Sequence, residues 1–196
     1  MPNWCSNRLT IEAKSDKDAE ILISAFKLGD REFSFNAIIP RPKELNILQG
    51  SVTSLAKEYL LETSIVDPKL LEKVNKRWRS KTELVHCDDP FSDDIRFGEG
   101  YEAFLKYAKA VAENISRFGH PNWFGWSMEN WGVKWDASSS KLTQKGKVLI
   151  FEFETAWAPP VPVFEYIAEH FADHIDSMTV NCVEEGCECY LNERYI

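Results

Sequence analysis

The segment of residues 135–157 constrains the fold of this chain more than any other. Two runs of strand-like composition lie on either side of the turn pair Lys145-Gly146, which is the pattern of a β-hairpin. The run after the turn is apolar over residues 148–153 apart from Glu152, as expected for a central strand that is covered on both faces. The chain must therefore build a sheet around this hairpin.

Further strand and helix patterns lie on both sides of the hairpin. Residues 7–13 alternate between apolar and polar side chains, which is typical of a half-buried strand. A helix follows, with Ser15 or Asp16 as its capping residue and Gly29 as its stop. The predicted strands are 7–13, 33–39, 135–144, 147–157, 178–182 and 187–195, and a second helix is predicted at 161–173.

Residues 43–119, between the second and third of these strands, have the pattern of a helical block. Amphipathic faces run along residues 52–60 and 101–118, and Asp67-Pro68 marks the start of a further helix. The acidic segment 86–100 is interpreted as a solvated connection, with an acidic contact surface as the alternative.

Without this block, the order of elements is strand, helix, strand, strand, helix, strand, with an extra strand at the C-terminus. That is the order of a ferredoxin-like domain. We therefore predict an α+β fold, in which residues 1–196 form a single ferredoxin-like domain. It has an antiparallel sheet, two core helices and a helical insertion at 43–119. The pattern leaves open whether 33–39 or 135–144 is the second core strand.

The overall charge and the cysteines narrow the classes of function. A net charge of −8 and a pI near 5.1 disfavour broad binding to nucleic acid, which requires clustered Lys and Arg, although a local basic groove remains compatible with them. Five cysteines at irregular spacing do not form a disulfide framework, which indicates a reducing cytoplasm. No segment approaches the ~20 apolar residues of a membrane helix, so we expect a soluble protein that does not enter the membrane.

Four segments of the chain resemble the YubB-type family of ferredoxin-like proteins carried by phages and plasmids. They are MPNWCSNRLTI at 1–11, FSFNAIIPRPKEL at 33–45, ENWGVKWDA at 129–137 and ETAWAPPVPVF at 154–164. The resemblance implies a ferredoxin-like fold with inserted helices and an accessory role in a mobile element. It implies no reaction and supplies no catalytic residue.

A candidate binding cluster lies in the tryptophan-rich part of the sequence. Trp side chains offer large apolar faces with one hydrogen-bond donor each, and a Lys above such a face makes a cation–π contact. The polar residues between the rings could line a pocket with Trp walls, or they could satisfy buried backbone groups while the rings fill the core. The cluster consists of Glu129, Asn130, Trp131, Lys134, Trp135, Asp136 and Trp157.

Other potential sites lack the partners that their chemistry requires. His170 and His174 are four positions apart at the end of the second predicted helix, at about 161–173, so they are expected to share a face, but Zn²⁺ needs a third ligand. Cys187 and Cys189 lack the spacing of common zinc sites, and no P-loop, dinucleotide or nucleophile-elbow motif occurs. We therefore predict no catalytic residue, no metal and no cofactor, and leave enzymatic activity uncertain and disfavoured.

These observations support three hypotheses for the function. The first is an accessory protein of a mobile element that binds a protein partner without catalysis. The second is a protein that stacks single-stranded nucleic acid on its sheet, which the net charge disfavours. The third is a small-ligand or enzymatic site at the tryptophan-rich cluster.

Overall fold

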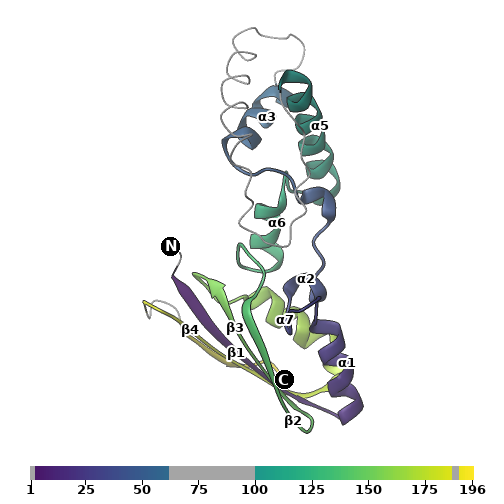
Figure 1. Cartoon of the computed structure of the whole chain (residues 1–196), viewed down its shortest axis with the longest axis vertical. Coiled ribbons are helices and arrows are strands. Elements are labelled where there is room, and N and C mark those ends of the chain that lie inside the picture. The colour runs from purple at the N-terminus through teal and green to yellow at the C-terminus, as the bar shows by residue number, and fades with distance from the viewer. Residues whose placement is uncertain (1–2, 62–99, 187–189) are drawn as a thin grey trace. The chain divides into compact units, whose positions relative to one another are not determined.

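The computed structural model describes residues 3–61, 100–186 and 190–196 (Figure 1). The chain divides into two compact units. One unit consists of residues 1–40 and 127–196, and the other consists of residues 41–126. The first unit contains the sheet, and the second is helical. No helix in the described parts of the chain has the length and apolar character needed to span a membrane.

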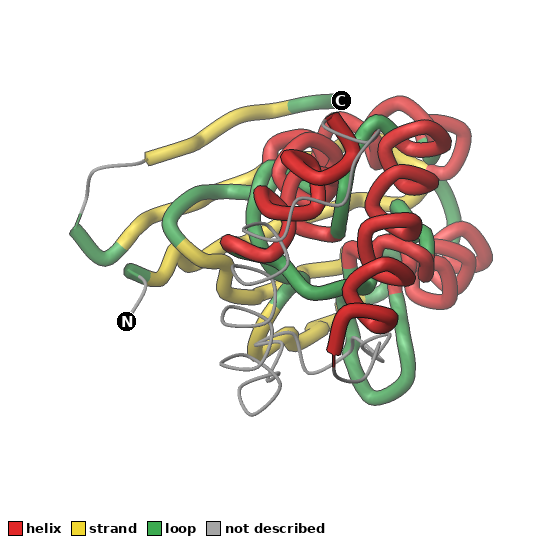
Figure 2. Tube along the Cα trace, turned by 90° about the horizontal axis from the view of Figure 1, so that it is seen from above, coloured by secondary structure: helices red, strands yellow, loops and turns green. Residues whose placement is uncertain are grey.

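The sheet of the first unit has five strands, whose neighbours are all antiparallel. Their order is β2-β3-β1-β4-β5, and they run side by side as one layer (Figure 2). The first four strands in this order have the ferredoxin-like arrangement, and β5 adds an edge strand, so the predicted fold class is confirmed. The strands are β1 (Trp4–Ala13), β2 (Ser138–Lys145), β3 (Val148–Ala156), β4 (Ile175–Glu184) and β5 (Tyr190–Arg194).

One face of this sheet is covered by helices and forms the core. The side chains of Leu9, Ile11 and Phe151 are fully buried on that face, because alternate residues of a strand point to the same side. Phe26 lies 5.7 Å from Phe151, ring centre to ring centre. The helices of this unit are α1 (Asp16–Phe26), α2 (Phe35–Ile38) and α7 (Val161–His170), with a short 3₁₀ turn, η2 (Ala172–His174).

The prediction of a strand at 33–39 is wrong, because α2 forms there. The alternation Phe33-Ser34-Phe35 resembled a strand with one apolar face. Instead, both Phe rings enter the same core, with centroids 6.0 Å apart in an edge-on arrangement. The open question about the second core strand is thereby answered, since β2 at Ser138–Lys145 occupies that place.

The remaining predicted elements of the first unit differ from the prediction only at their ends. The Ser15 side chain caps α1 by accepting a hydrogen bond from the Asp18 backbone N–H at 3.2 Å, and the helix stops at Phe26, before Gly29. The predicted helix 161–173 stops at His170. The C-terminal strand begins at Tyr190, and residues 187–189 lie outside the described residues.

The second unit is built on two helices that pack on each other. The helices predicted at 52–60 and 101–118 are confirmed. The helix expected after Asp67-Pro68 and nearly all of the acidic segment 86–100 lie outside the described residues, and the domain boundary at 43–119 stays a prediction. The elements are η1 (Lys43–Leu45), α3 (Ser51–Leu61), α5 (Gly100–Phe118) and α6 (Trp123–Asn130), which begins in this unit.

Candidate functional site

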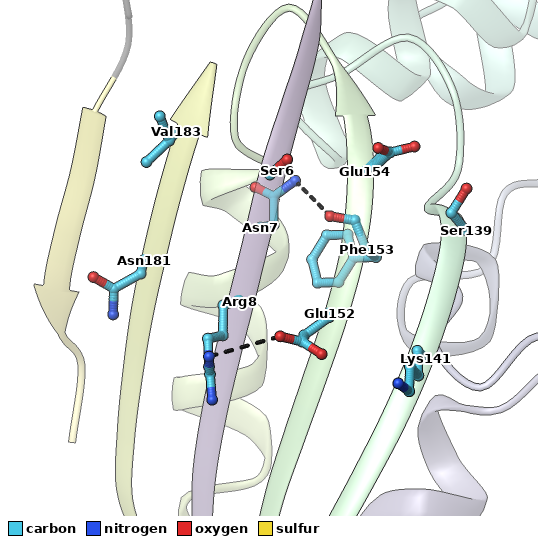
Figure 3. Close-up of a pocket in the computed structure, with 10 residues that line it drawn as sticks. All are labelled: Ser6, Asn7, Arg8, Ser139, Lys141, Glu152, Phe153, Glu154, Asn181 and Val183. Carbon is cyan, nitrogen blue, oxygen red and sulfur yellow. Dashed lines mark hydrogen bonds and ion pairs between the residues drawn. The ribbon is translucent and has the colours of Figure 1, made fainter. Parts of the chain in front are cut away.

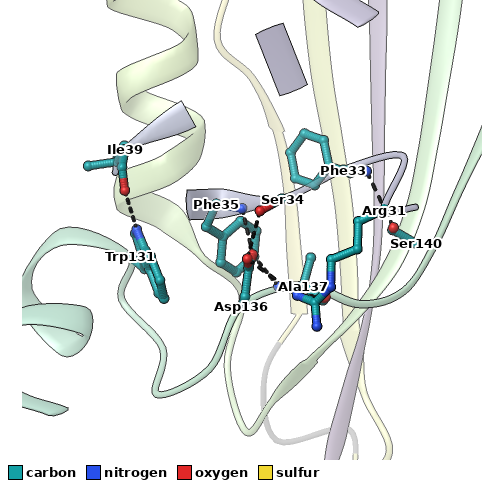
Figure 4. A network of polar contacts seen from close by, with 9 residues as sticks. All are labelled: Arg31, Phe33, Ser34, Phe35, Ile39, Trp131, Asp136, Ala137 and Ser140. Atoms are coloured by element: carbon teal, nitrogen blue, oxygen red, sulfur yellow. Dashed lines mark hydrogen bonds and ion pairs between the residues drawn. The ribbon is translucent and has the colours of Figure 1, made fainter. Parts of the chain in front are cut away.

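Asp136 is the centre of a buried polar network in the first unit (Figure 4). Its Oδ2 accepts a hydrogen bond from the Ser34 hydroxyl at 2.7 Å. Its Oδ1 accepts from the backbone N–H of Phe35 at 2.6 Å and of Ala137 at 2.7 Å. The Arg31 guanidinium lies 3.3 Å from Oδ2. The carboxylate thus satisfies the first N–H of α2, which has no partner within the helix.

Burial raises the pKa of Asp136 above its ordinary value, and the hydrogen bonds from Ser34 and Phe35 and the charge of Arg31 oppose that rise. Asp136 is only 7% exposed, and its carboxylate oxygens contact a side-chain hydroxyl, two backbone N–H groups and a guanidinium of the protein itself. This geometry gives Asp136 a structural role, in which it fastens α2 to the chain that leads into β2.

Trp131 belongs to the same structural arrangement. Its indole Nε1 donates to the backbone carbonyl of Ile39 at 3.1 Å, and its ring meets that of Phe35 edge-on at 5.9 Å. Only 1% of its surface is exposed. Glu129 and Asn130 close helix α6, where Glu129 is exposed and Asn130 is half-buried. Asp136 and Trp131 therefore make structural contacts with α2 and with Ile39, the residue that follows it.

Lys134, Trp135 and Trp157 form a second group, which we call the tryptophan stack. The rings of Trp135 and Trp157 are nearly parallel, with an interplanar angle of 26° and centroids 6.0 Å apart. The Lys134 ammonium lies 4.2 Å from the centre of the Trp135 ring, within the range of a cation–π contact. The Trp135 Nε1 is buried and has no hydrogen-bond partner among the described residues.

Trp157 is the exposed end of the stack, with 52% of its surface accessible. Its backbone is left-handed, at a φ of +66°, which costs about 1–2 kcal/mol for any residue other than glycine. Fixed hydrogen bonds hold this conformation. The Trp157 N–H donates to the Asn3 carbonyl at 2.9 Å, and the Thr155 hydroxyl donates to the Ala158 carbonyl at 2.7 Å. The buried Asn7 amide donates in turn to Thr155 Oγ1 at 2.9 Å.

The face of the sheet opposite the core carries a polar hollow of about 480 Å³ (Figure 3). One row of residues in register crosses all five strands at the hollow. In this row Arg8 on β1 lies opposite Glu152 on β3 and opposite Asn181 on β4. Asn181 is opposite Asn192, and Glu152 is opposite Lys141. Arg8 and Glu152 form an exposed ion pair at 3.7 Å. We call this surface the open face.

Lys141 and Glu154 also line the hollow, and neither side chain has a hydrogen bond or ion pair to another described residue. Ser6 stands between Glu154 and the exposed Val183 in the next row. Sequence reasoning missed this surface. The alternation at 7–13 and the glutamates at 152 and 154 show that these two strands carry polar side chains, but only the strand order brings those side chains together.

The histidines and potential metal ligands do not form a centre in the described part of the chain. His170 ends α7, and His174 lies beyond it in η2, so the expected shared helix face is not formed. The His174 Nδ1 instead contacts the Asp18 carboxylate at 2.7 Å. The described residues contain no group of three or more His, Cys, Asp or Glu side chains that could hold a metal ion.

Comparisons with known proteins agree on the fold. Residues 130–190 match the sequence model of a family described as "Ferredoxin-like domain in Api92-like protein". The crystal structure of protein api92 from Yersinia pseudotuberculosis superposes with a TM-score of 0.52 at 11% sequence identity, covering 100% of this chain and 94% of that one. At this identity the likeness shows the fold alone. No curated protein sequence matches the chain.

Proposed function

We propose that this chain is a non-catalytic binding protein and that Trp157 anchors a protein partner. The observation that carries the proposal is the half-exposed indole of Trp157, held by hydrogen bonds in a left-handed backbone. A strained conformation persists only where its surroundings fix it, and such conformations cluster at functional sites.

An exposed and rigid tryptophan suits protein recognition. Trp is enriched among the few residues that supply most of the binding energy at protein interfaces. The indole buries a large area when a partner covers it, and a side chain that is already stacked on Trp135 loses little freedom on binding. The stack therefore presents a preorganised anchor.

The contacts of the other cluster residues support a protein partner over a small ligand. A ligand pocket requires polar groups directed into a cavity. Asp136 directs its oxygens to Ser34 Oγ and to backbone N–H groups, and Trp131 donates to Ile39. The charged residues of the hollow on the open face are two basic and two acidic ones, so this face lacks the excess of positive charge that the phosphate backbone of single-stranded nucleic acid requires.

The accessory role in a phage or plasmid is part of the same proposal. It is supported by the resemblance of the segments at 1–11, 33–45, 129–137 and 154–164 to the YubB-type family. We propose further that the protein acts in the cytoplasm, where Cys5 and Cys182, both buried and free of disulfides, remain as thiols.

The proposal is tested by capturing partners with the tagged full chain from a bacterial lysate, with and without nuclease. Trp157→Ala is compared with Ile21→Ala, a matched control because Ile21 is also exposed, at 36%, but lies on α1. Circular dichroism and urea unfolding establish that each variant is folded before capture.

We expect a stoichiometric protein that survives nuclease, binds the Ile21 variant and fails to bind the Trp157 variant. Recovery of nucleic acid that depends on Trp157 would replace the proposal with the single-strand alternative. A partner that binds both variants equally would overturn the role of Trp157.

A further inference from the structure

We propose that two copies of this chain associate through their open faces. The inference rests on the charge pattern of that face and is independent of the role proposed for Trp157. The four charged residues around the hollow are Arg8, Lys141, Glu152 and Glu154, two of each sign. A surface that carries both signs can be complementary to itself, because in a two-fold interface a contact between one residue and a different residue of the second copy is made twice.

The pairing within one copy leaves one charge of each sign available. Arg8 and Glu152 neutralise each other at 3.7 Å. Lys141 on β2 and Glu154 on β3 have no ion-pair partner among the described residues. In a two-fold dimer, Lys141 of each copy meets Glu154 of the other, so one geometric contact is made twice. A partner of a single sign could satisfy only half of this surface.

The dimensions of the face fit an association of modest strength. Five strands spaced about 4.8 Å apart, with about eight residues of about 3.3 Å each, cover roughly 600 Å². A standard stable interface buries about 800 Å² on each partner. Facing sheets lie about 10 Å apart, a gap that long Arg, Lys and Glu side chains can fill from both sides. The exposed Val183 adds apolar area at the hollow. Because this area is below the standard size, we expect a weak dimer that forms at high protein concentration.

Charge reversal provides a test that needs no unknown partner. Sedimentation equilibrium of the full chain is measured for the wild type, Lys141→Glu, Glu154→Lys and a mixture of the two variants. Lys17→Glu on α1 and Glu169→Lys on α7 make the same charge changes on exposed helix positions of the same unit. They serve as matched controls.

We expect a concentration-dependent wild-type dimer, and a dissociation constant raised at least about tenfold by either reversal, because two attractive contacts become two repulsive ones. The controls should behave as the wild type. Mixing Lys141→Glu with Glu154→Lys should restore dimers as one-to-one heterodimers, since both contacts regain opposite charges.

Two outcomes would overturn the inference. The first is a wild-type chain that stays monomeric up to ~1 mM, because only complexes with a dissociation constant of about 1 mM or higher remain largely dissociated at that concentration. The second is a dimer that both reversals leave unchanged, which would assign self-association to another surface. Neither outcome bears on Trp157, so the proposed function is tested separately by the capture experiment.

Discussion

Replacement of Asp136 measures how much one buried carboxylate contributes to the first unit. Asp136→Ala removes the acceptor of three hydrogen bonds, from the Ser34 hydroxyl and from the N–H groups of Phe35 and Ala137. It also leaves Arg31, whose side chain is 17% exposed, without its carboxylate at 3.3 Å. A buried donor left without a partner costs about 1–3 kcal/mol, and breaking a buried ion pair costs about 3–5 kcal/mol.

These costs overlap, because the same carboxylate supplies all of the contacts and water can enter the space it leaves. We expect Asp136→Ala to lower the free energy of unfolding by about 3–5 kcal/mol in total. Asp136→Asn should cost less, at about 1–2 kcal/mol. Its amide oxygen can still accept from Phe35 and Ala137, and its amide nitrogen can donate to the Ser34 hydroxyl oxygen.

Equilibrium unfolding in urea gives both values from the transition midpoint and slope. The decisive observation is the order of the variants, with Ala well below Asn and Asn below the wild type. A loss under 1 kcal/mol for Asp136→Ala would refute the structural role. Equal losses for Ala and Asn would show that the charge, and not the set of accepted hydrogen bonds, controls stability.

Three further predictions concern other parts of the structure. Trp157→Gly should be about 1 kcal/mol more stable than Trp157→Ala in urea, the reverse of the usual order, because only glycine adopts a φ of +66° without strain; equal stability would contradict this. Tyr107→Phe should lose about 1–2 kcal/mol of unfolding free energy, since the buried hydroxyl contacts Thr53 Oγ1 and the Leu48 carbonyl; no loss would show that water replaces these bonds. Hydrogen bonds with Ser15 and His174 hold the pKa of Asp18 below its usual 3.8. The contribution of Asp18 to stability is therefore present above pH 3.8 and is lost as the pH falls through the lowered pKa. The stability of Asp18→Asn should fall less steeply with pH below 3.8, and an unchanged profile of acid unfolding would contradict the assignment.

The sequence predicted the strands whose pattern reports directly on burial. Residues 7–13 were assigned correctly because one side of that strand packs on the core. Residues 148–153 form the interior strand β3 as predicted, but the expectation that both of its faces are covered is wrong, since the side that carries Glu152 lies on the open face. The segment 33–39 misled, since alternating apolar residues also occur where a short helix and the turn before it bury two neighbouring rings. Asp136 stabilises the start of α2 by accepting a hydrogen bond from the Phe35 N–H across 101 positions of the chain. A contact between residues so far apart cannot be recognised in the local sequence.

The candidate site was predictable only in part. Lys134, Trp135 and Trp157 do come together, as the interleaving of rings and charges suggested. Asp136 and Trp131 were expected beside them but face inward. The pair Lys141 and Glu154 could not be found from sequence, because it depends on strand register. Helix α6 had a signal that went unused, namely Asn122, whose side chain accepts from the Phe124 N–H at 3.1 Å, as an N-terminal cap does.

The central position of β1 has a consequence for how the chain is made. This strand is synthesised before the other four strands of the sheet, yet both of its neighbours, β3 and β4, come from the last third of the given sequence. The Trp4 N–H, for example, contacts the Glu185 carboxylate 181 positions later. At about 5–20 residues per second, synthesis separates the two by about 10–35 s. During that time the apolar side of β1 has no sheet to join, whereas α3 and α5 can already pack on each other. Slower translation of the last third would prolong this exposure and should lower the yield of folded protein.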